Sequence, residues 1–283
     1  MPTVGIEMKS CSDDKNLRVA LCQIRCSLGN KEENIAKMKN ILEEHSADLY
    51  VFPELFLTGY MVRDDIFRLS ESPSGSSFQA VAKLSKQHGV GIIFGAAVND
   101  NLSGIIKNSA VAVQPNGQIE RYDKIHLANF GPFEEGLYFT PGENLRIIEI
   151  YGFKFGLIIC YDIFFPELVK SYATAGVDGI ICISASPVTS KFSFETVMPA
   201  RAVENATYMI YVNQSGPQLN QVFFGGSGAM DPFGKQIVKN SYFNSDVTIA
   251  TLNKSILERA KKMRPTVRDS LGFKRNIDVL GQE

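Results

Sequence analysis

The sequence lacks both an excess of charge of either sign and a long apolar segment. Its 29 Lys and Arg residues nearly balance its 30 Asp and Glu residues, which gives a formal net charge of −1. Nucleic acids and anionic membranes are usually bound by clustered Lys and Arg, so this balance favours neither partner. No apolar run approaches the roughly 20 residues of a membrane-spanning helix, and residues 1–16 lack the apolar block of a signal peptide. We therefore expect a cytoplasmic protein that binds neither nucleic acid nor a membrane.

Histidine and cysteine are also scarce. The five cysteines are an odd number, and Cys22 with Cys26 has no second Cys or His pair to complete a zinc site. We expect free thiols and no metal. A mechanism that depends on a histidine base has only three candidates, His45, His88 and His126.

The composition is that of a globular protein. Of the 283 residues, 45% are hydrophobic and 21% are charged, and that length suits one large α/β domain or two smaller ones. We find no linker, composition break or internal repeat, so we expect a single domain over residues 1–283. Residues 1–16 form a polar N-terminal extension. The tail at residues 264–283 carries spaced apolar residues, and we expect it to pack on a partner subunit.

Hydrophobic periodicity predicts strands that alternate with helices. Hairpins at residues 115–117 and 231–234 exclude a purely parallel sheet, so we expect an α/β domain with mixed sheets inside and helices outside. An eight-stranded (β/α) barrel is the competing fold, and the hairpins and the small number of crossover helices count against it. The expected strands are 17–24, 48–52, 91–97, 109–114, 118–122, 153–159, 179–184, 208–212 and 247–252. The expected helices are 31–45, 76–88, 166–175, 255–263 and a stretch at 194–205 that Pro199 interrupts or starts.

Cys160 is the first candidate for a reactive side chain. It ends the apolar run 156–159 and precedes a turn and a helix that begins at Pro166. This strand, turn and helix would present a side chain as a nucleophile elbow does. The alternative is a buried apolar thiol, which is the commoner state of free cysteine.

Glu54 and Lys124 are the other two candidates. Glu54 follows a short apolar strand, and a carboxylate among apolar neighbours has a raised pKa that suits a general base. Lys124 lies in a long loop, where a cation could lower a thiol pKa or stabilise an oxyanion. Taken singly, Glu54 is more simply a loop carboxylate and Lys124 a solvated surface charge.

Glu54, Lys124 and Cys160, in this order and with their flanking residues, resemble the nitrilase, or carbon-nitrogen hydrolase, superfamily. The resemblance runs from residues 19–23 to residues 231–234 and includes residues 139–142, 200–205, 212–213 and 225–227. It implies a four-layer αββα sandwich with two mixed sheets, and assembly into a homodimer or a higher homo-oligomer. It also implies Glu-Lys-Cys catalysis without a cofactor.

The resemblance assigns roles to further residues. The family has a second glutamate shortly before its Phe-x-Pro-Gly motif. Here Glu134 and Glu135 are adjacent, and the spacing favours Glu135, which would orient the substrate or Lys124. Arg201 and Glu204 match as well, and we expect them to form an ion pair or a buried hydrogen-bonding pair that supports the site.

The implied reaction is hydrolysis of an amide through a cysteine thioester. Lys124 favours the Cys160 thiolate, Glu54 accepts its proton, and the thiolate attacks the carbonyl carbon. Lys124 and the backbone N–H of Tyr161 would stabilise the oxyanion. Protonated Glu54 would then give its proton to the leaving ammonia or amine and afterwards activate water.

Aromatic residues near these motifs could line the acyl pocket or belong to the core, and both interpretations stay open. The candidates are Tyr60, Phe164, Phe165, Phe192 and Phe194.

The residues after the nucleophile bear on the substrate. Cys160-Tyr161-Asp162-Ile163 resembles the amidase and carbamoylase branches, whereas nitrilases proper usually carry Cys-Trp-Glu-Asn. Several branches, among them dicarboxylate ω-amidases, have an arginine where this chain has Phe164, which cannot pair with a carboxylate. This speaks against an acidic substrate, although a basic group elsewhere could replace the arginine.

Two other stretches, 55–60 and 129–135, resemble the glutaminase domain of glutamine-dependent NAD synthetases. Because these 283 residues contain no synthetase half, we expect a free-standing amidase acting on a small linear amide. The alternatives are a glutaminase-like ammonia supplier to a partner, an N-carbamoyl amidohydrolase, a nitrilase, or a non-enzymatic scaffold. Thiol labelling would separate enzyme from scaffold, because a scaffold needs no reactive cysteine.

Overall fold

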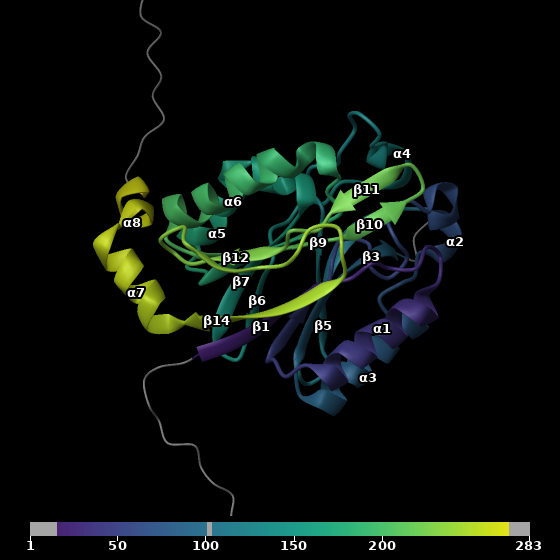
Figure 1. The fold of residues 1–283 in the computed structure, drawn as a ribbon, viewed down its shortest axis with the longest axis horizontal. Helices are drawn as coiled ribbons and strands as arrows, with labels where there is room; N and C mark the ends of the chain where they lie inside the picture. Colours follow the sequence, from purple (N-terminus) through teal and green to yellow (C-terminus); the bar gives the residue numbers. More distant parts are fainter. Residues whose placement is uncertain (1–15, 101–103, 272–283) are drawn as a thin grey trace, which may run out of the picture.

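Two six-stranded sheets pack face to face in the computed structural model, which describes residues 16–100 and 104–271. Helices α1 and α3 cover the outer face of one sheet, and α5 and α6 cover the outer face of the other (Figure 1). These layers confirm the αββα sandwich that the resemblance implies.

The first sheet has the strand order β14-β1-β2-β3-β4-β5. Its strands are β1 (Asn16–Gln23), β2 (Leu49–Val51), β3 (Gly91–Asn99), β4 (Ile106–Val113), β5 (Ile119–Asp123) and β14 (Asp246–Asn253). The second sheet has the order β13-β12-β9-β8-β7-β6. Its strands are β6 (Ile147–Ile150), β7 (Phe153–Ile159), β8 (Gly179–Ser184), β9 (Tyr208–Asn213), β12 (Gly228–Met230) and β13 (Gln236–Lys239). A separate ribbon consists of β10 (Ser215–Gln218) and β11 (Gln221–Phe224).

The helices are mostly of ordinary length. They are α1 (Lys31–Glu44), α2 (Ile66–Leu69), α3 (Ser76–His88), α4 (Glu135–Tyr138), α5 (Pro166–Thr174), α6 (Lys191–Asn205), α7 (Lys254–Met263) and α8 (Thr266–Ser270). Short 3₁₀ turns are η1 (Arg63–Asp65), η2 (Cys160–Phe164) and η3 (Val188–Ser190).

Strand direction brings several chain segments to one edge of the sandwich. β1, β2 and β3 are parallel, and β5 runs in the same direction because β4 is antiparallel to both of its neighbours. In the second sheet β7, β8 and β9 are parallel. The carboxyl ends of parallel strands meet at one edge, which is where ligands gather in α/β proteins. The three candidate residues each follow the carboxyl end of one of these strands.

Three apolar layers hold the four structural layers together. Between the sheets, residues such as Leu21 of β1 and Leu157 of β7 are fully buried in one cluster. Two further clusters fill the space between a sheet and its helices, one around Met38 of α1 and one around Met198 of α6. Because the central strands are covered on both faces, they have continuous apolar runs instead of alternating ones.

Local sequence signals explain several element ends. The side chain of Asn30 accepts a hydrogen bond from the backbone N–H of Glu33, as a helix N-cap does, at the start of α1. Gly89 ends α3 with a φ of +65°, a left-handed value that glycine adopts without steric cost. Pro166 occupies the first turn of α5, where its missing N–H has no helical acceptor to lose. The hairpins expected at residues 115–117 and 231–234 are confirmed by the β4–β5 and β12–β13 pairs.

The structure also differs from the sequence expectations. β6, β10 and β11 were not expected, and each of them has only four residues. α6 begins at Lys191, so Pro199 lies inside the helix and does not start it. A core strand was expected at 247–252, but the strand found there, β14, lies at the edge of its sheet and is buried only in part.

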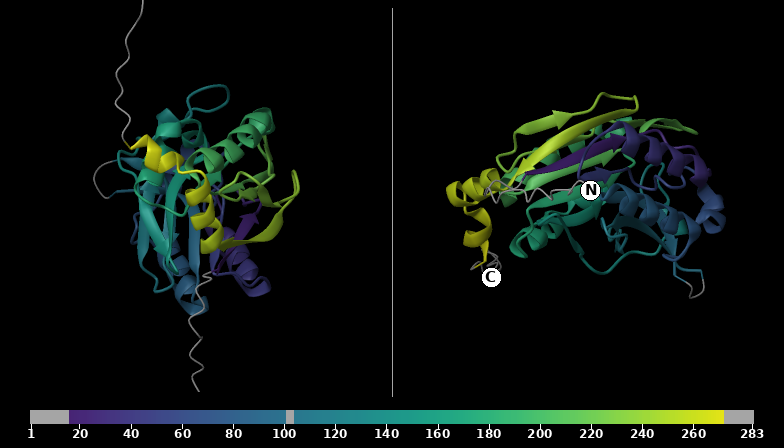
Figure 2. Two further views of the ribbon diagram at one scale, coloured as in Figure 1. Left: turned by 90° about the vertical axis from the view of Figure 1, so that its left-hand side faces the viewer. Right: turned by 90° about the horizontal axis from the view of Figure 1, so that it is seen from below.

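The C-terminal helices lie at one end of the sandwich (Figure 2). α8 contacts α5 and α6 of its own chain, and the hydroxyl of Thr266 donates to the backbone oxygen of Glu204. The beginning of the expected tail therefore packs within the chain, and residues 272–283 lie outside the described residues. In the part of the chain that the structure describes, no helix has the length and apolar character needed to cross a membrane.

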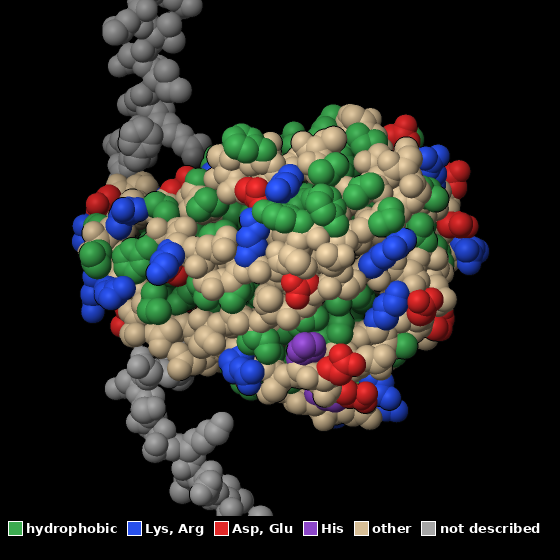
Figure 3. Space-filling model, viewed as in Figure 1, with side chains coloured by type: hydrophobic (Ala, Val, Ile, Leu, Met, Phe, Trp, Pro, Cys, Tyr) green, Lys and Arg blue, Asp and Glu red, His purple; other side chains and the backbone are tan. Residues whose placement is uncertain are grey.

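Several large hydrophobic side chains are exposed. Figure 3 shows patches of hydrophobic side chains on the face that carries α6 and the β12–β13 hairpin. Phe192 of α6 is 81% exposed, and Ile237 of β13 and Phe243 are exposed as well. Exposed apolar patches commonly mark protein interaction surfaces, and the expected association of subunits stays a prediction.

Gly95 of β3 allows the chain after β2 to approach the sheet. A Cβ atom at this position would lie 2.1 Å from the backbone nitrogen of Leu55 and 2.6 Å from the Cα of Glu54. We predict that Gly95→Ala lowers the free energy of unfolding by about 2 kcal/mol, because a rigid backbone must move away. Urea denaturation measures this.

The matched control is Gly136→Ala. The nearest atoms to a Cβ there belong to the side chain of Asn129, at 2.9 Å, and this side chain can rotate. We expect a change within about 0.5 kcal/mol. Equal effects of the two substitutions would contradict the close approach at Gly95.

Candidate active site

Glu54 is fully buried where the chain leaves β2 and continues beside β3. Backbone hydrogen bonds hold this stretch in place, from Gly95 N to Pro53 O at 3.0 Å and from Leu57 N to Gly95 O at 3.1 Å. The Oε2 atom of Glu54 accepts a hydrogen bond from the backbone N–H of Ala185 at 2.8 Å. Ala185 follows β8 of the opposite sheet, so this contact connects the two sheets at the site.

Lys124 is also buried, and its ammonium group lies between two carboxylates. Its Nζ atom donates to Oε1 of Glu54 at 2.8 Å and to Oε1 of Glu135 at 2.7 Å. The backbone of Lys124 is fixed by two hydrogen bonds, from its N–H to Asn108 O and from Gly142 N to its carbonyl. The solvated surface lysine considered as the alternative is therefore wrong.

Glu135 begins the short helix α4 and is 3% exposed, whereas Glu134 is exposed. Its Oε1 atom also accepts from the hydroxyl of Tyr60 at 2.6 Å, and its Oε2 atom accepts from Ala128 N at 2.9 Å. The structure thus brings Glu135, and not Glu134, to the buried lysine, as the motif spacing favoured.

Cys160 stands at the sharp turn between β7 and η2. Its φ is +48°, a left-handed value that is rare for residues other than glycine and that marks local strain. Its Sγ atom lies 3.6 Å from the hydroxyl oxygen of Ser186, which follows β8. The strand, turn and helix confirm the elbow geometry expected for a nucleophile.

Asp162 holds this turn in place, and sequence reasoning missed it. Its Oδ2 atom accepts from the hydroxyl of Tyr122 at 2.7 Å and from the backbone N–H of Ile159 at 3.1 Å. Its Oδ1 atom accepts from the backbone N–H of His126 at 2.9 Å. One buried carboxylate thus connects the Cys160 turn to the segment around Lys124. The available signal was a carboxylate inside an otherwise apolar stretch, two residues after the nucleophile candidate.

Asn108 of β4 is a second residue that sequence reasoning missed. Its Nδ2 atom donates to Oε1 of Glu54 at 2.8 Å, beside the bond from Lys124. Its backbone carbonyl accepts from Lys124 N. Asn108 therefore positions both members of the ion pair, and no sequence signal marks it, because it stands between Lys107 and Ser109, just before the expected strand 109–114.

Arg201 and Glu204 form the expected pair on α6. The Nη1 atom of Arg201 lies 3.0 Å from Oε1 of Glu204, and its Nε atom donates to the backbone oxygen of Ile163 at 2.9 Å. Because Ile163 belongs to η2, this bond attaches α6 to the turn that carries Cys160.

Burial and charge set the protonation of the cluster. Desolvation, reinforced by the neighbouring carboxylate of Glu135, raises the pKa of Glu54 despite the opposing effect of Lys124. The two carboxylates raise the pKa of Lys124 well above its ordinary value, although burial opposes this, so the lysine stays charged.

Cys160 is a thiol at rest. Burial and the charge of Glu54 raise the pKa of Cys160 to about 12, and the opposing effect of Lys124 is too small to reverse this. Lys124 thus favours the thiolate, as expected, but not strongly enough to keep Cys160 ionised at rest. A base must remove the thiol proton when Cys160 reacts.

Cys160 opens into a cavity of about 220 Å³. Its walls come from the loop at residues 128–133, from η2 and from the segment 186–194. It is lined by Tyr60, Ala128, Phe130, Phe133, Cys160, Tyr161, Phe164, Ser186, Pro187, Ser190, Ser193 and Phe194.

The expected pocket aromatics divide into two groups. Tyr60, Phe164 and Phe194 line the cavity, as expected. Phe165 does not, because its ring stacks on the imidazole of His126 with centroids 3.4 Å apart. Phe192 does not line it either, and its side chain is 81% exposed.

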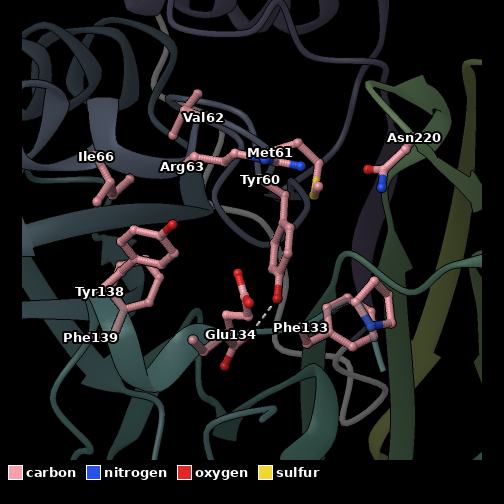
Figure 4. Close-up of a pocket in the computed structure, with 12 residues that line it drawn as sticks. Tyr60, Met61, Val62, Arg63, Ile66, Phe133, Glu134, Tyr138, Phe139 and Asn220 are labelled. Carbon is pink, nitrogen blue, oxygen red and sulfur yellow. Dashed lines mark hydrogen bonds between the residues drawn. The ribbon is translucent and has the colours of Figure 1, made fainter. Parts of the chain in front are cut away.

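Figure 4 shows a second cavity, of about 290 Å³. Tyr60 and Phe133 line both cavities. Its charged lining residues among the described ones are Arg63, Glu134 and Glu135. In the described ranges, no three His, Cys, Asp or Glu side chains gather as metal ligands would.

Comparison with known proteins bears on this arrangement. The family model described as carbon-nitrogen hydrolase matches residues 18–262. A glutamine-dependent NAD(+) synthetase of Thermotoga maritima is 34% identical over 84% of this chain and 42% of its own length. A 2-oxoglutaramate amidase of Bacillus subtilis is 30% identical over 78% of this chain and 85% of its own length.

Solved structures agree on the fold. A CN-hydrolase superfamily protein of Xanthomonas campestris superposes with a TM-score of 0.83 at 22% identity, covering 94% of this chain and all of that one. The family model extends over most of the chain, from β1 to α7, and includes every residue of the buried cluster. This protein belongs to the carbon-nitrogen hydrolase family of the nitrilase superfamily.

Proposed function

We propose that this protein is an amidase that hydrolyses small linear amides, with Cys160 as the nucleophile, Glu54 as the general base and Lys124 as the oxyanion stabiliser. The observation that carries the proposal is a strained cysteine that opens into a cavity beside a buried Glu-Lys-Glu cluster. The similarity to a 2-oxoglutaramate amidase supports amide hydrolysis as the reaction.

The first half-reaction forms a thioester and releases the amine. Glu54 takes the proton of the Cys160 thiol while Sγ attacks the amide carbon, and the C=O electron pair moves onto oxygen. The oxyanion accepts hydrogen bonds from Lys124 and from the backbone N–H of Tyr161. Tyr161 lies in the first turn of η2, where N–H groups have no partner within the helix. One such donor typically lowers the activation free energy by about 3 kcal/mol.

The first half-reaction ends when the C–N bond breaks, as Glu54 gives its proton to the leaving nitrogen and ammonia or an amine departs. The second half-reaction returns the enzyme to its resting state. Glu54 then takes a proton from water as the water oxygen attacks the thioester carbon. The C–S bond breaks, the acid is released, and Sγ regains a proton from Glu54. Glu135 positions Lys124 throughout, through the 2.7 Å contact between them.

A raised pKa suits Glu54 for this double role. A carboxylate whose pKa lies closer to neutral pH accepts and returns a proton more readily than an ordinary one. Burial supplies that shift, and the hydrogen bonds from Lys124 and Asn108 limit it. Holding one ammonium and two carboxylates away from water is also costly. A scaffold that catalyses no reaction has no need for such a destabilising buried cluster, so its presence favours an enzyme.

A glutaminase-like role in supplying ammonia to a partner is the second candidate. It is supported by the 34% identity to a glutamine-dependent NAD(+) synthetase. Ammonia release from a panel of amides separates the two candidates, since a glutaminase would prefer glutamine to other amides.

The test is ammonia release from aliphatic amides, glutamine, asparagine, carbamoyl amines and nitriles. We expect release from amides, and a loss of at least about 1,000-fold in kcat for Cys160→Ala. Cys22→Ala is the matched control, because Cys22 is buried between the first sheet and its helices. It should retain most of the activity. Release that is unaffected by Cys160→Ala would contradict the proposal, and release from nitriles alone would replace amidase with nitrilase.

Glu54→Gln should move two properties of the enzyme in opposite directions. Removing the negative charge lowers the pKa of Cys160, so its thiolate fraction rises, and alkylation by iodoacetamide at pH 8 becomes faster. Hydrolysis is nevertheless lost because no base remains. Peptide mapping of the alkylated cysteine and an ammonia assay measure the two effects.

Glu134→Gln is the control for this experiment. Glu134 is exposed, and the carboxylate of this segment that accepts a hydrogen bond from Lys124 belongs to Glu135. It should change neither rate appreciably. A parallel fall of alkylation and hydrolysis in Glu54→Gln would mean that Glu54 stabilises the fold or the thiolate instead of acting as the base.

A further inference from the structure

The cavity beside Cys160 has a continuous aromatic wall. Five successive ring contacts run from Tyr60 through Phe133, Phe130, Tyr161 and Phe164 to Phe194, with centroids 4.8–5.9 Å apart. Three of these pairs join different chain segments, so the wall depends on the tertiary fold. The remaining polar groups of the lining are serine hydroxyls and backbone.

The described lining of this cavity contains no charged side chain. The charged cluster lies outside this lining: Glu135 contributes to the second cavity, and Lys124 and Glu54 are buried and do not line the cavity. A carboxylate or ammonium placed among the rings would lose its hydration without gaining an ion pair. The faces of aromatic rings are also electrostatically negative, which further disfavours an anion.

The size of the cavity limits what it can hold. An apolar cavity of about 150 Å³ accommodates benzene, so 220 Å³ accommodates a phenyl ring and a short linker. Because Cys160 is itself part of the wall, an acyl group bonded to Sγ projects directly into this space. A phenyl ring there can make edge-to-face contacts with the surrounding rings.

We infer that this enzyme selects amides whose acyl group is uncharged and carries an aromatic ring on a short linker, with phenylacetamide as the representative. The inference rests on the proposed function. Phe164 is the residue that determines this selectivity, because its ring closes the wall between Tyr161 and Phe194.

The experiment compares kcat/KM for phenylacetamide and for succinamate, the monoamide of succinic acid, which has a carboxylate in place of the ring. We expect phenylacetamide to be favoured by about 100-fold, since an unpaired buried charge is rejected strongly. Phe164→Arg should shift this ratio towards succinamate by at least about 100-fold. Phe164→Leu removes the ring without adding charge, so it should weaken phenylacetamide hydrolysis and leave succinamate hydrolysis unimproved.

Val62→Arg is the matched control, because it adds the same cation to the second cavity. It should leave the ratio unchanged. If Val62→Arg alters the ratio and Phe164→Arg does not, the acyl group lies in the second cavity and the inference is wrong. Should Phe164→Arg fail to fold, equal hydrolysis of phenylacetamide by Phe164→Leu and the unmodified chain would also overturn it.

Binding separates a failure of the inference from a failure of the proposed function. Calorimetric titration of Cys160→Ala with phenylacetamide needs no turnover, and we expect saturable binding that Phe164→Arg abolishes in the same background. Binding without hydrolysis of any amide by the intact enzyme would refute the proposed function alone. Cys160-dependent hydrolysis that favours succinamate, or binding of succinamate in preference to phenylacetamide, would refute the inference alone.

Discussion

The contact on which the site depends is the buried ammonium of Lys124 between Glu54 and Glu135. Three ionised groups out of water are tolerated only where geometry and hydrogen bonds compensate for lost hydration. Here the backbone N–H of Ala185 donates a hydrogen bond to the Glu54 carboxylate, and that of Ala128 donates one to the Glu135 carboxylate. These donors come from segments far apart in sequence, so only the folded sandwich can supply the hydrogen bonds that offset the lost hydration of the cluster.

The cluster contains one basic and two acidic side chains, and burial of the thiol together with this imbalance raises the pKa of Cys160. A single lysine cannot offset two carboxylates and the loss of water around Sγ, so the pKa of Cys160 rises to about 12. A resting thiol is protected from adventitious oxidation and alkylation, both of which require the thiolate. Reactivity then depends on Glu54 accepting a proton during attack, which links the nucleophile to the base energetically.

Much of this site could be predicted from the sequence, because Glu54 and Cys160 follow apolar strands and Lys124 follows the strand after the hairpin at residues 115–117. Side chains at the carboxyl ends of parallel strands converge, and the family resemblance specified which of them matter. Choosing Glu135 over Glu134 needed only motif spacing. Local patterns together with the family resemblance were therefore sufficient where the candidate residue lies at the end of a regular element.

The remaining residues could not be predicted, because their roles arise from contacts between distant segments. Asp162 is important through bonds to Tyr122 and His126, and nothing in its own neighbourhood in the sequence indicates those partners. Adjacent phenylalanines likewise diverge: Phe164 lines the cavity, whereas Phe165 turns away to stack on His126. The short 3₁₀ turn decides which of the two faces the cavity, and composition cannot.

The most direct test of the account is rapid-quench mass spectrometry of the enzyme during hydrolysis of an amide. The account predicts a covalent adduct with the mass of the acyl group, confined to the peptide that contains Cys160 and lost on treatment with hydroxylamine. Steady hydrolysis without any acyl adduct, or an adduct on another residue, would contradict thioester chemistry at Cys160.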